Sequence, residues 1–110
     1  MAQNIFTIKK RSTFVIIRNE GKFIKGKNIN VQILYNQDLE NSIGVGYTAS
    51  KKIGNAVKRN KAKRIMRELA RKIIINGKIN SYYVLIAKPS LLNEKFDKLL
   101  LELKDKINDK

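Results

Sequence analysis

The chain has 110 residues, 43% of them hydrophobic and 30% charged, a composition typical of one globular domain that buries its own core. It holds 24 Lys and Arg against 9 Asp and Glu, a formal charge of +15, with no cysteine and no histidine. These absences exclude a disulfide, a thiolate zinc site and a Ser-His-Asp triad. A polyanion is the usual partner of so basic a domain.

No apolar stretch has the length of a membrane span. The longest, from Tyr82 to Ala87, is far shorter than the roughly 20 residues required. The first eight residues lack the basic and then apolar pattern of a signal peptide. We therefore expect a cytoplasmic protein with no membrane partner. We expect one RNA-binding domain over 1–110, with flexible ends at 1–8 and 108–110.

The first predicted element, residues 13–17, is ambiguous. Its β-branched residues favour a strand. Ser12, followed by Phe14 and Ile17 three residues apart, also suits a short helix. The residues alone leave both structures open.

Two strands are predicted next. Apolar and polar residues alternate over 29–35 and again over 43–50, where one face carries only small residues. The polar segment 36–42 separates the two runs. The pattern therefore predicts an antiparallel hairpin with a fairly long loop.

A long helix follows. Asn55 is a residue type that caps helix N-termini, and Asn76-Gly77 is a helix stop. Between them lies an apolar stripe at helical spacing: Ala62, Ile65, Met66, Leu69 and Ile73.

The last two elements are a strand and a helix. The continuous apolar run 82–87 predicts a strand buried on both faces, ended by Pro89. Asn93 is suited to cap a final helix with a clean apolar stripe. The predicted elements in chain order are a helix or a strand, then two strands, a helix, a strand and a helix. We predict an α+β fold, a small sandwich with one sheet packed against helices.

The positive charge is concentrated in the predicted long helix and just before it. Residues 51–72 hold ten basic residues and one acid, Glu68. On a helical wheel the basic residues lie roughly opposite the apolar stripe. A solvated face usually mixes charge signs. The apolar face is regular enough to be core, and the helix lies between two predicted strands in the chain, which argues against a membrane-bound helix. The pattern favours contact with nucleic-acid phosphates, which would relieve the repulsion.

Three other chemistries are excluded by context. Residues 44–49 match G-x-G-x-x-A, but they lie within a predicted strand and no helix opens in them. Residues 21–27 match G-x-x-x-x-G-K, but Asn28 replaces the required Ser or Thr. The acids are scattered, so a two-metal nuclease centre would need another molecule.

Residues 50–68, SKKIGNAVKRNKAKRIMRE, resemble the protein component of bacterial ribonuclease P. That family carries a stretch close to S-x-K-x-G-N-A-V-x-R-N-R-x-K-R-x-x-R. The spacing of Phe14 to Gly21 and the segment 87–89 fit as well, so the resemblance covers roughly 9–107. It implies that the first element is a helix. It also implies a left-handed, ribosomal-protein-like β-α-β crossover, whereas the general rule predicts a right-handed one.

The resemblance further implies a function. The chain would be the protein subunit of a ribonucleoprotein endoribonuclease that removes the 5′ leader of precursor tRNA. The catalytic RNA and the substrate would hold the Mg²⁺ ions, so the chain itself would have no catalytic residue, no metal ligand and no small-molecule cofactor. The catalytic RNA would bind a basic helix made of Arg59, Asn60, Lys61, Lys63, Arg64, Arg67 and Arg71. The single-stranded leader would lie in a cleft between the first helix and the sheet, at Phe14, Ile17, Arg18, Lys51 and Lys52.

Two residues depart from the family pattern. Lys61 replaces an Arg and loses its planar fork for phosphate. Ile17 stands where an aromatic residue is common, which weakens base stacking. Two other functions share the composition: a structural RNA-binding protein, such as a ribosomal protein, and a DNA-binding module. The long motif favours ribonuclease P over the first, and no dimer seam supports the second.

Overall fold

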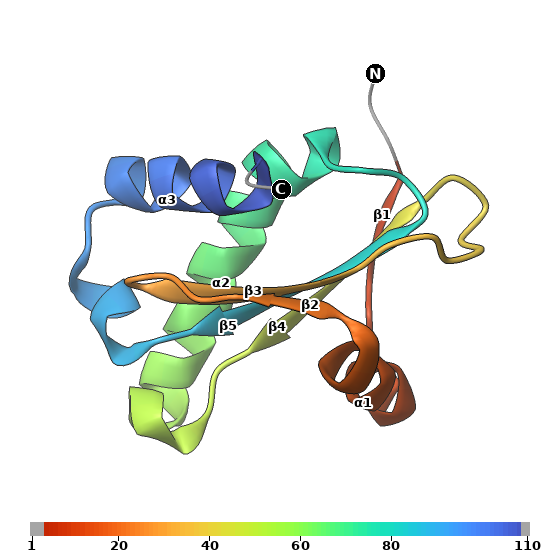
Figure 1. Ribbon diagram of the computed structural model, residues 1–110. Helices are drawn as coiled ribbons and strands as arrows, with labels where there is room; N and C mark the ends of the chain where they lie inside the picture. The colour runs from red at the N-terminus through yellow and green to blue at the C-terminus, as the bar shows by residue number, and fades with distance from the viewer. Residues whose placement is uncertain (1–3, 109–110) are drawn as a thin grey trace.

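The computed structural model describes residues 4–108, which form one five-stranded sheet and three α-helices (Figure 1). The predicted α+β class is confirmed. Short 3-10 turns lie at Lys51–Ile53, Ile74–Asn76 and Pro89–Asn93. The helices and strands are, in chain order, β1 (Ile5–Thr7), α1 (Arg11–Glu20), β2 (Lys22–Ile24), β3 (Ile29–Leu34), β4 (Ile43–Thr48), α2 (Ala56–Ile73), β5 (Ser81–Ala87) and α3 (Phe96–Asn108).

The strand order in the sheet is β1-β4-β5-β3-β2, which corrects the predicted hairpin. β3 and β4 do not pair, because β5 lies between them, antiparallel to β3 and parallel to β4. Burial explains this order, since β5 is the most apolar strand and the centre of the sheet is its driest place. The hairpin in the structure is β2–β3, which the sequence analysis did not predict.

Helices cover both faces of the sheet. α2 and α3 pack on one face, and α1 lies on the other (Figure 1). The larger core lies under α2 and α3, where Met66, Leu85 and Leu103 are fully buried. A smaller cluster of Ile8, Ile17 and Val84 lies under α1. The sheet therefore holds α1 and α2 at fixed positions on opposite sides of β4.

The N-terminal region is more ordered than predicted. The first predicted element, residues 13–17, lies in the helix α1, as the resemblance implies. Residues 5–7, expected to be a flexible end, form β1 and pair in parallel with β4. The Ile8 backbone N–H donates to the Val45 carbonyl at 2.8 Å, and Ile8 is buried. At the other end, Asn108 is the last residue of α3. The rest of the expected flexible ends lies outside the described residues.

The predicted start of the long helix is confirmed. The Asn55 side-chain oxygen accepts a hydrogen bond from the Lys58 backbone N–H at 3.0 Å, which caps α2. Asn93, by contrast, does not cap the last helix. It ends the turn that Pro89 begins, and α3 starts at Phe96. α2 joins the parallel strands β4 and β5, and the hand of this crossover stays a prediction.

Candidate nucleic-acid interface

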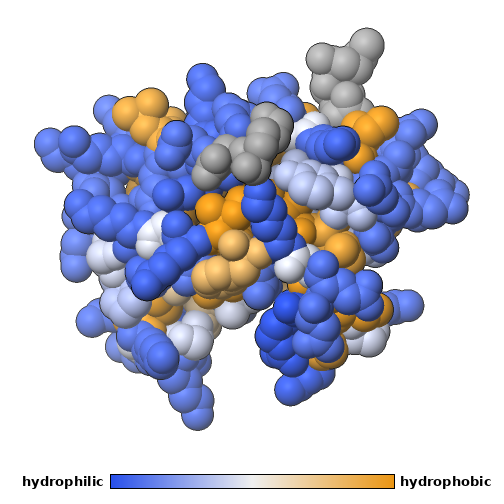
Figure 2. Space-filling model, in the orientation of Figure 1, coloured by the Kyte–Doolittle hydropathy of each residue, from blue (hydrophilic) through white to orange (hydrophobic). Residues whose placement is uncertain are grey.

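A groove of about 530 Å³ lies where α1, β4 and α2 meet. In Figure 2 a notch separates α1 from the segment at the start of α2. Four cationic side chains and no carboxylate line the groove. Its lining consists of Lys9, Arg11, Phe14, Val15, Arg18, Tyr47, Thr48, Ala49 and Lys63. We call it the leader groove below, after the cleft that the sequence analysis expected here.

A glycine in β4 allows α1 to approach the sheet closely enough to form this groove. A Cβ atom at Gly46 would lie 2.4 Å from one ring carbon of Phe14 and 2.7 Å from another. Real Cβ atoms do not come so close, so any other residue would displace the ring. The Phe14 ring therefore rests on the backbone of β4, half-buried, with the rest of it in the groove.

The structure corrects one predicted leader residue. Ile17 has no exposed surface and packs with Ile8 and Val84 under α1. Helical geometry explains this, because Phe14 and Arg18 are four residues apart and share the groove side of α1, whereas Ile17 is turned toward the sheet. Arg18 lines the groove as predicted, and Ile17 supports the helix from below.

Lys51 and Lys52 lie beside the leader groove but not in its lining. They form the exposed 3-10 turn that follows β4, two residues after the lining residue Ala49. The Ser50 hydroxyl caps this turn by accepting the Lys52 backbone N–H at 3.3 Å. The two ammonium groups therefore extend the positive charge beyond one end of the groove.

The basic helix is α2, and its predicted residues separate into two kinds. Asn60, Lys61, Arg64, Arg67 and Arg71 are exposed, whereas Arg59 and Lys63 are partly buried. The two partly buried side chains have different places in the structure.

The Arg59 guanidinium is used within the fold. It donates to the Gly54 carbonyl at 3.0 Å and so holds the loop before α2. Gly54 has φ +138°, a conformation that side chains oppose, so this loop requires glycine. Lys63 instead lines the leader groove. The two residue sets that the sequence analysis kept apart meet at Lys63.

Tyr47 connects the groove to the basic helix. Its ring lines the groove, and the Arg67 guanidinium carbon lies 5.8 Å from the ring centroid, within the range of a cation–π contact. Burial raises the pKa of Tyr47, and the charges of Arg67 and Arg71 partly oppose that rise. Tyr47 was not among the residues predicted for the site.

Other groove residues were also missed by sequence reasoning. Arg11 and Val15 are four residues apart along α1, and together with the predicted Arg18, three residues further on, they face the groove. That spacing is a helical signal, but it is visible only once the ambiguous first element is known to be a helix.

One acid interrupts the basic helix. The Glu68 carboxylate forms an ion pair with Arg71, the only ion pair found within residues 4–108. Both side chains are largely exposed. Arg71 is therefore partly neutralised, whereas Arg64 and Arg67 carry unpaired charges.

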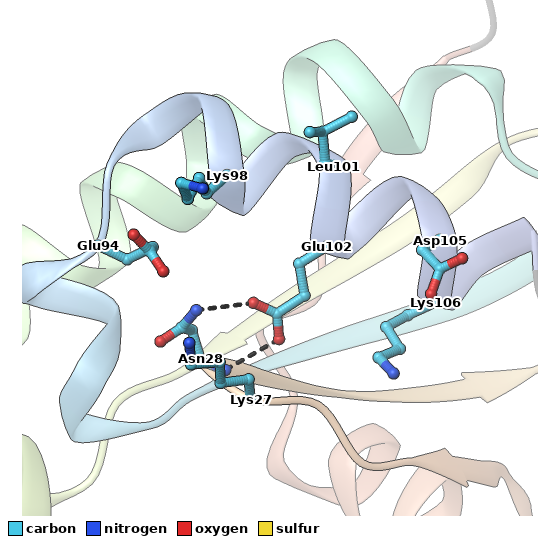
Figure 3. A pocket seen from close by; sticks show the side chains of 8 residues that line it. All are labelled: Lys27, Asn28, Glu94, Lys98, Leu101, Glu102, Asp105 and Lys106. Carbon is cyan, nitrogen blue, oxygen red and sulfur yellow. Dashed lines mark hydrogen bonds between the residues drawn. The ribbon is translucent and has the colours of Figure 1, made fainter.

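A second hollow, beneath α3, differs in its charge balance (Figure 3). Its volume is about 600 Å³, and three lysines and three carboxylates line it. The Glu102 carboxylate accepts the Asn28 backbone N–H and side-chain amide, each at 2.9 Å. Glu94 accepts the Lys95 backbone N–H, and this bond, with the nearby charge of Lys27, holds the pKa of Glu94 below its usual value.

Two further properties concern metals and membranes. No group of three or more acidic side chains in the part that the structure describes is arranged to hold a metal ion. Across the same residues, no helix combines the length and the apolar character needed to cross a membrane.

Comparison with known proteins gives consistent matches. The family model described as ribonuclease P matches residues 3–109. The ribonuclease P protein component of Caulobacter vibrioides is 33% identical over 98 residues, which cover 88% of this chain and 65% of that protein. The chain thus spans about two thirds of this relative's length. The ribonuclease P protein component of Gluconacetobacter diazotrophicus is 30% identical over 105 residues, 94% of this chain and 90% of that protein.

Solved structures agree. The RNase P protein of Staphylococcus aureus superimposes with a TM-score of 0.78 at 26% identity, covering 91% of this chain and 90% of that one. The RNase P protein of Thermotoga maritima, at 22% identity, gives a TM-score of 0.79 over 92% of this chain and 94% of that one, and shares the fold.

Proposed function

This chain belongs to the ribonuclease P protein family, and from that premise we propose that it is the protein subunit of a ribonucleoprotein endoribonuclease. In this role it binds a catalytic RNA and the 5′ leader of precursor tRNA, and it promotes removal of the leader. The observation that carries the proposal is the meeting of the leader groove and the basic helix. Lys63 belongs to both, and Tyr47 in the groove contacts Arg67 on the helix.

The exposed side of α2 supports binding of the catalytic RNA. Asn60, Lys61, Arg64 and Arg67 are exposed, and no acid among residues 4–108 forms an ion pair with them. Arginine suits a bidentate contact with phosphate, and Lys61 offers a point charge in its place. Arg59 supports the site indirectly, because its hydrogen bond to the Gly54 carbonyl holds the loop that precedes α2.

The leader groove supports binding of a single strand. Its floor holds an aromatic ring, Phe14, on which an unpaired base can stack. Its rim holds Arg11, Arg18 and Lys63, which can follow the phosphates of that strand. Lys51 and Lys52, in the turn beside the groove, can bind phosphates of the strand beyond the end of the groove. Stacking and backbone charge together favour a single strand without strict sequence preference.

The hydrolysis itself is assigned to the RNA. The catalytic Mg²⁺ ions would be held by the catalytic RNA and the substrate, where they supply an activated water and stabilise the leaving oxygen. Within residues 4–108 no group of three or more acids is arranged to hold a metal ion, and two of the acids are engaged elsewhere: Glu102 is bonded to Asn28 and Glu68 to Arg71. We place the enzyme in the cytoplasm, with no membrane partner and no small-molecule cofactor.

Cleavage of precursor tRNA at low Mg²⁺ tests the proposal. Three reactions are compared: the protein alone, a bacterial ribonuclease P RNA alone, and the mixture. Cleavage at the mature 5′ end only in the mixture is the expected result. Arg18→Ala should weaken binding of precursor tRNA but not of mature tRNA, whereas Lys27→Ala, in the hollow beneath α3, should change neither. Tight RNA binding without any stimulation of cleavage would instead support a structural RNA-binding protein.

A further inference from the structure

We propose that a further hollow, on the other side of the α1 N-terminus, binds an unpaired RNA base, which stacks on the exposed Phe6 ring beside Tyr82. This inference rests on the RNA-binding role proposed above and adds a site to it. The hollow has a volume of about 300 Å³, at the small end of the range for ligand pockets. We call it the aromatic hollow.

The two rings are placed side by side by the register of the sheet. Phe6 of β1 lies opposite Gly44 of β4, and Gly44 lies opposite Tyr82 of β5. The rings of Phe6 and Tyr82 meet above the glycine edge to face, with centroids 6.4 Å apart and an interplanar angle of 81°. All three residues stand on the face of the sheet that carries α1.

Gly44 is the reason that the rings can meet. A Cβ atom there would lie 2.7 Å from the Tyr82 ring and 2.9 Å from the Phe6 ring. β4 thus uses two glycines in the same way: Gly46 admits Phe14 in the leader groove, and Gly44 admits the aromatic pair.

An aromatic pair on a sheet face has an ordinary alternative explanation, which is burial in the core. Exposure argues against it here, because 41% of Phe6 is accessible to solvent. The pair also lies outside both buried core clusters, with only Tyr82 packed against the smaller one. An exposed ring on a sheet, with a second ring beside it, is how single-stranded RNA is commonly stacked.

The charge around the aromatic hollow identifies its occupant as a polyanion. Lys9 and Lys10 line it, together with the Thr13 hydroxyl, and no carboxylate does. Lys9 also lines the leader groove, so the two hollows adjoin at the start of α1. One RNA strand can therefore stack a base on Phe14, follow Lys9, and stack a further base on Phe6. The same geometry accepts an unpaired base of the catalytic RNA.

The test compares Phe6→Leu with Phe23→Leu. Phe23 is a matched control, because it is also an exposed phenylalanine on a three-residue strand at an edge of the same sheet, with 54% of its surface accessible. It has no aromatic partner in the part of the chain described. Thermal unfolding of both variants checks that neither change alters the fold. Phe6→Tyr keeps a ring and should retain wild-type affinity.

Binding is measured in three arms. The first uses a single-stranded oligonucleotide and the protein alone, which is informative even if the protein stimulates no cleavage. The second uses the complex with catalytic RNA and precursor tRNAs whose leaders increase in length. The third uses the catalytic RNA alone. Loss of one stacked base should lower affinity about fivefold or more for Phe6→Leu, with less than a twofold change for Phe23→Leu.

The pattern across the arms identifies the source of the base. A loss confined to long leaders assigns the aromatic hollow to the leader, and a loss with the catalytic RNA alone assigns it to that RNA. Lys10→Ala, which touches this hollow and not the leader groove, should follow the same pattern. Equal affinities of Phe6→Leu and Phe23→Leu in all three arms would overturn the proposal, and would leave the leader groove unaffected.

Discussion

The leader groove and the hollow beneath α3 have similar volumes, about 530 and 600 Å³, but the lining of the first is positively charged and that of the second is balanced. Four cations and no acid line the leader groove. Three lysines face three carboxylates beneath α3, and one of the carboxylates, Glu102, bonds to the buried Asn28.

We interpret the difference as that between the proposed binding surface and a structural one. Unpaired positive charges repel one another and weaken the fold, so their concentration beside the half-buried ring of Phe14 favours an external anion as partner. Balanced charges beneath α3 need no such partner. Size alone favours the hollow beneath α3, whereas uncompensated charge favours the leader groove, which is the binding site that we propose.

The largest expected effect comes from removing three positive charges from the basic helix, with the removal of three positive charges beneath α3 as the control. The triple variant Lys63→Ala, Arg64→Ala, Arg67→Ala should lower RNA affinity about a hundredfold, because three phosphate contacts are lost. The slope of log Kd against log salt should fall by about two to three units. The control Lys27→Ala, Lys98→Ala, Lys106→Ala removes the same charge beneath α3 and should leave most of the slope. Equal slopes in both variants would mean that RNA responds only to net charge.

The second effect concerns stability. Glu102→Ala removes both bonds between Glu102 and Asn28, a residue that is only 3% exposed. Hydrogen bonds to a charged group are strong, so we expect a loss of about 2–4 kcal/mol in the free energy of unfolding. Thermal denaturation followed by circular dichroism should show a fall in Tm of about 10–20 °C.

The matched control is Asp105→Ala, which lines the same hollow without a hydrogen bond to Asn28. It should change the Tm little. The Glu102→Ala variant, measured at temperatures where it remains folded, should bind RNA like the wild type. A large loss of RNA affinity would show that the hollow beneath α3 is more than structural.

The sequence predicted the helices and strands better than it predicted which strands pair. The apolar stripe and the Asn55 cap of α2 follow from local spacing and capping chemistry, and both are confirmed. The pairing of β3 with β4 failed because adjacency in sequence is only a prior, and burial of the apolar β5 between them outweighs it. β1 and β2 are three-residue strands, too short to show a period of two.

Prediction of the site has a similar limit. The basic side of α2 is visible on a helical wheel, because it depends only on the 3.6-residue period. The groove depends on what α1 brings to β4, and the side of α1 that faces the groove could not be known while a strand was still possible. Ile17 was placed in the cleft by the family resemblance alone, and Tyr47 was missed because its contact with Arg67 joins two elements.

The third effect is a pH dependence, and it contrasts a tyrosine of the groove with one of the core. Burial raises the pKa of both Tyr47 and Tyr83 above the ordinary value of 10.0. The unfolded chain therefore releases these protons first. The stability associated with them is complete below about pH 10 and is lost as the pH rises through the folded-state values.

Denaturant unfolding between pH 8 and 11 measures this effect with Tyr83→Phe. At pH 8 the variant should be less stable by about 1 kcal/mol, because the Tyr83 hydroxyl accepts the Lys78 backbone N–H at 2.9 Å. Above pH 10 its stability should decline less steeply than that of the wild type. Parallel curves for the two proteins would show that the Tyr83 hydroxyl makes no contribution to the alkaline loss.

The smallest expected effect lies at the one compensated point of the basic helix. Glu68→Gln breaks the exposed ion pair with Arg71, which should change the free energy of unfolding by no more than about 0.5 kcal/mol. Arg71 then becomes as free as Arg67, and the salt slope of RNA binding should rise by up to about one unit. Glu40→Gln, which makes the same charge change in the loop between β3 and β4, is the control and should not alter the slope. If Glu68→Gln also leaves the slope unchanged, Arg71 does not contact the RNA. The RNA-binding side of α2 would then end at Arg67, whose guanidinium contacts the Tyr47 ring of the leader groove.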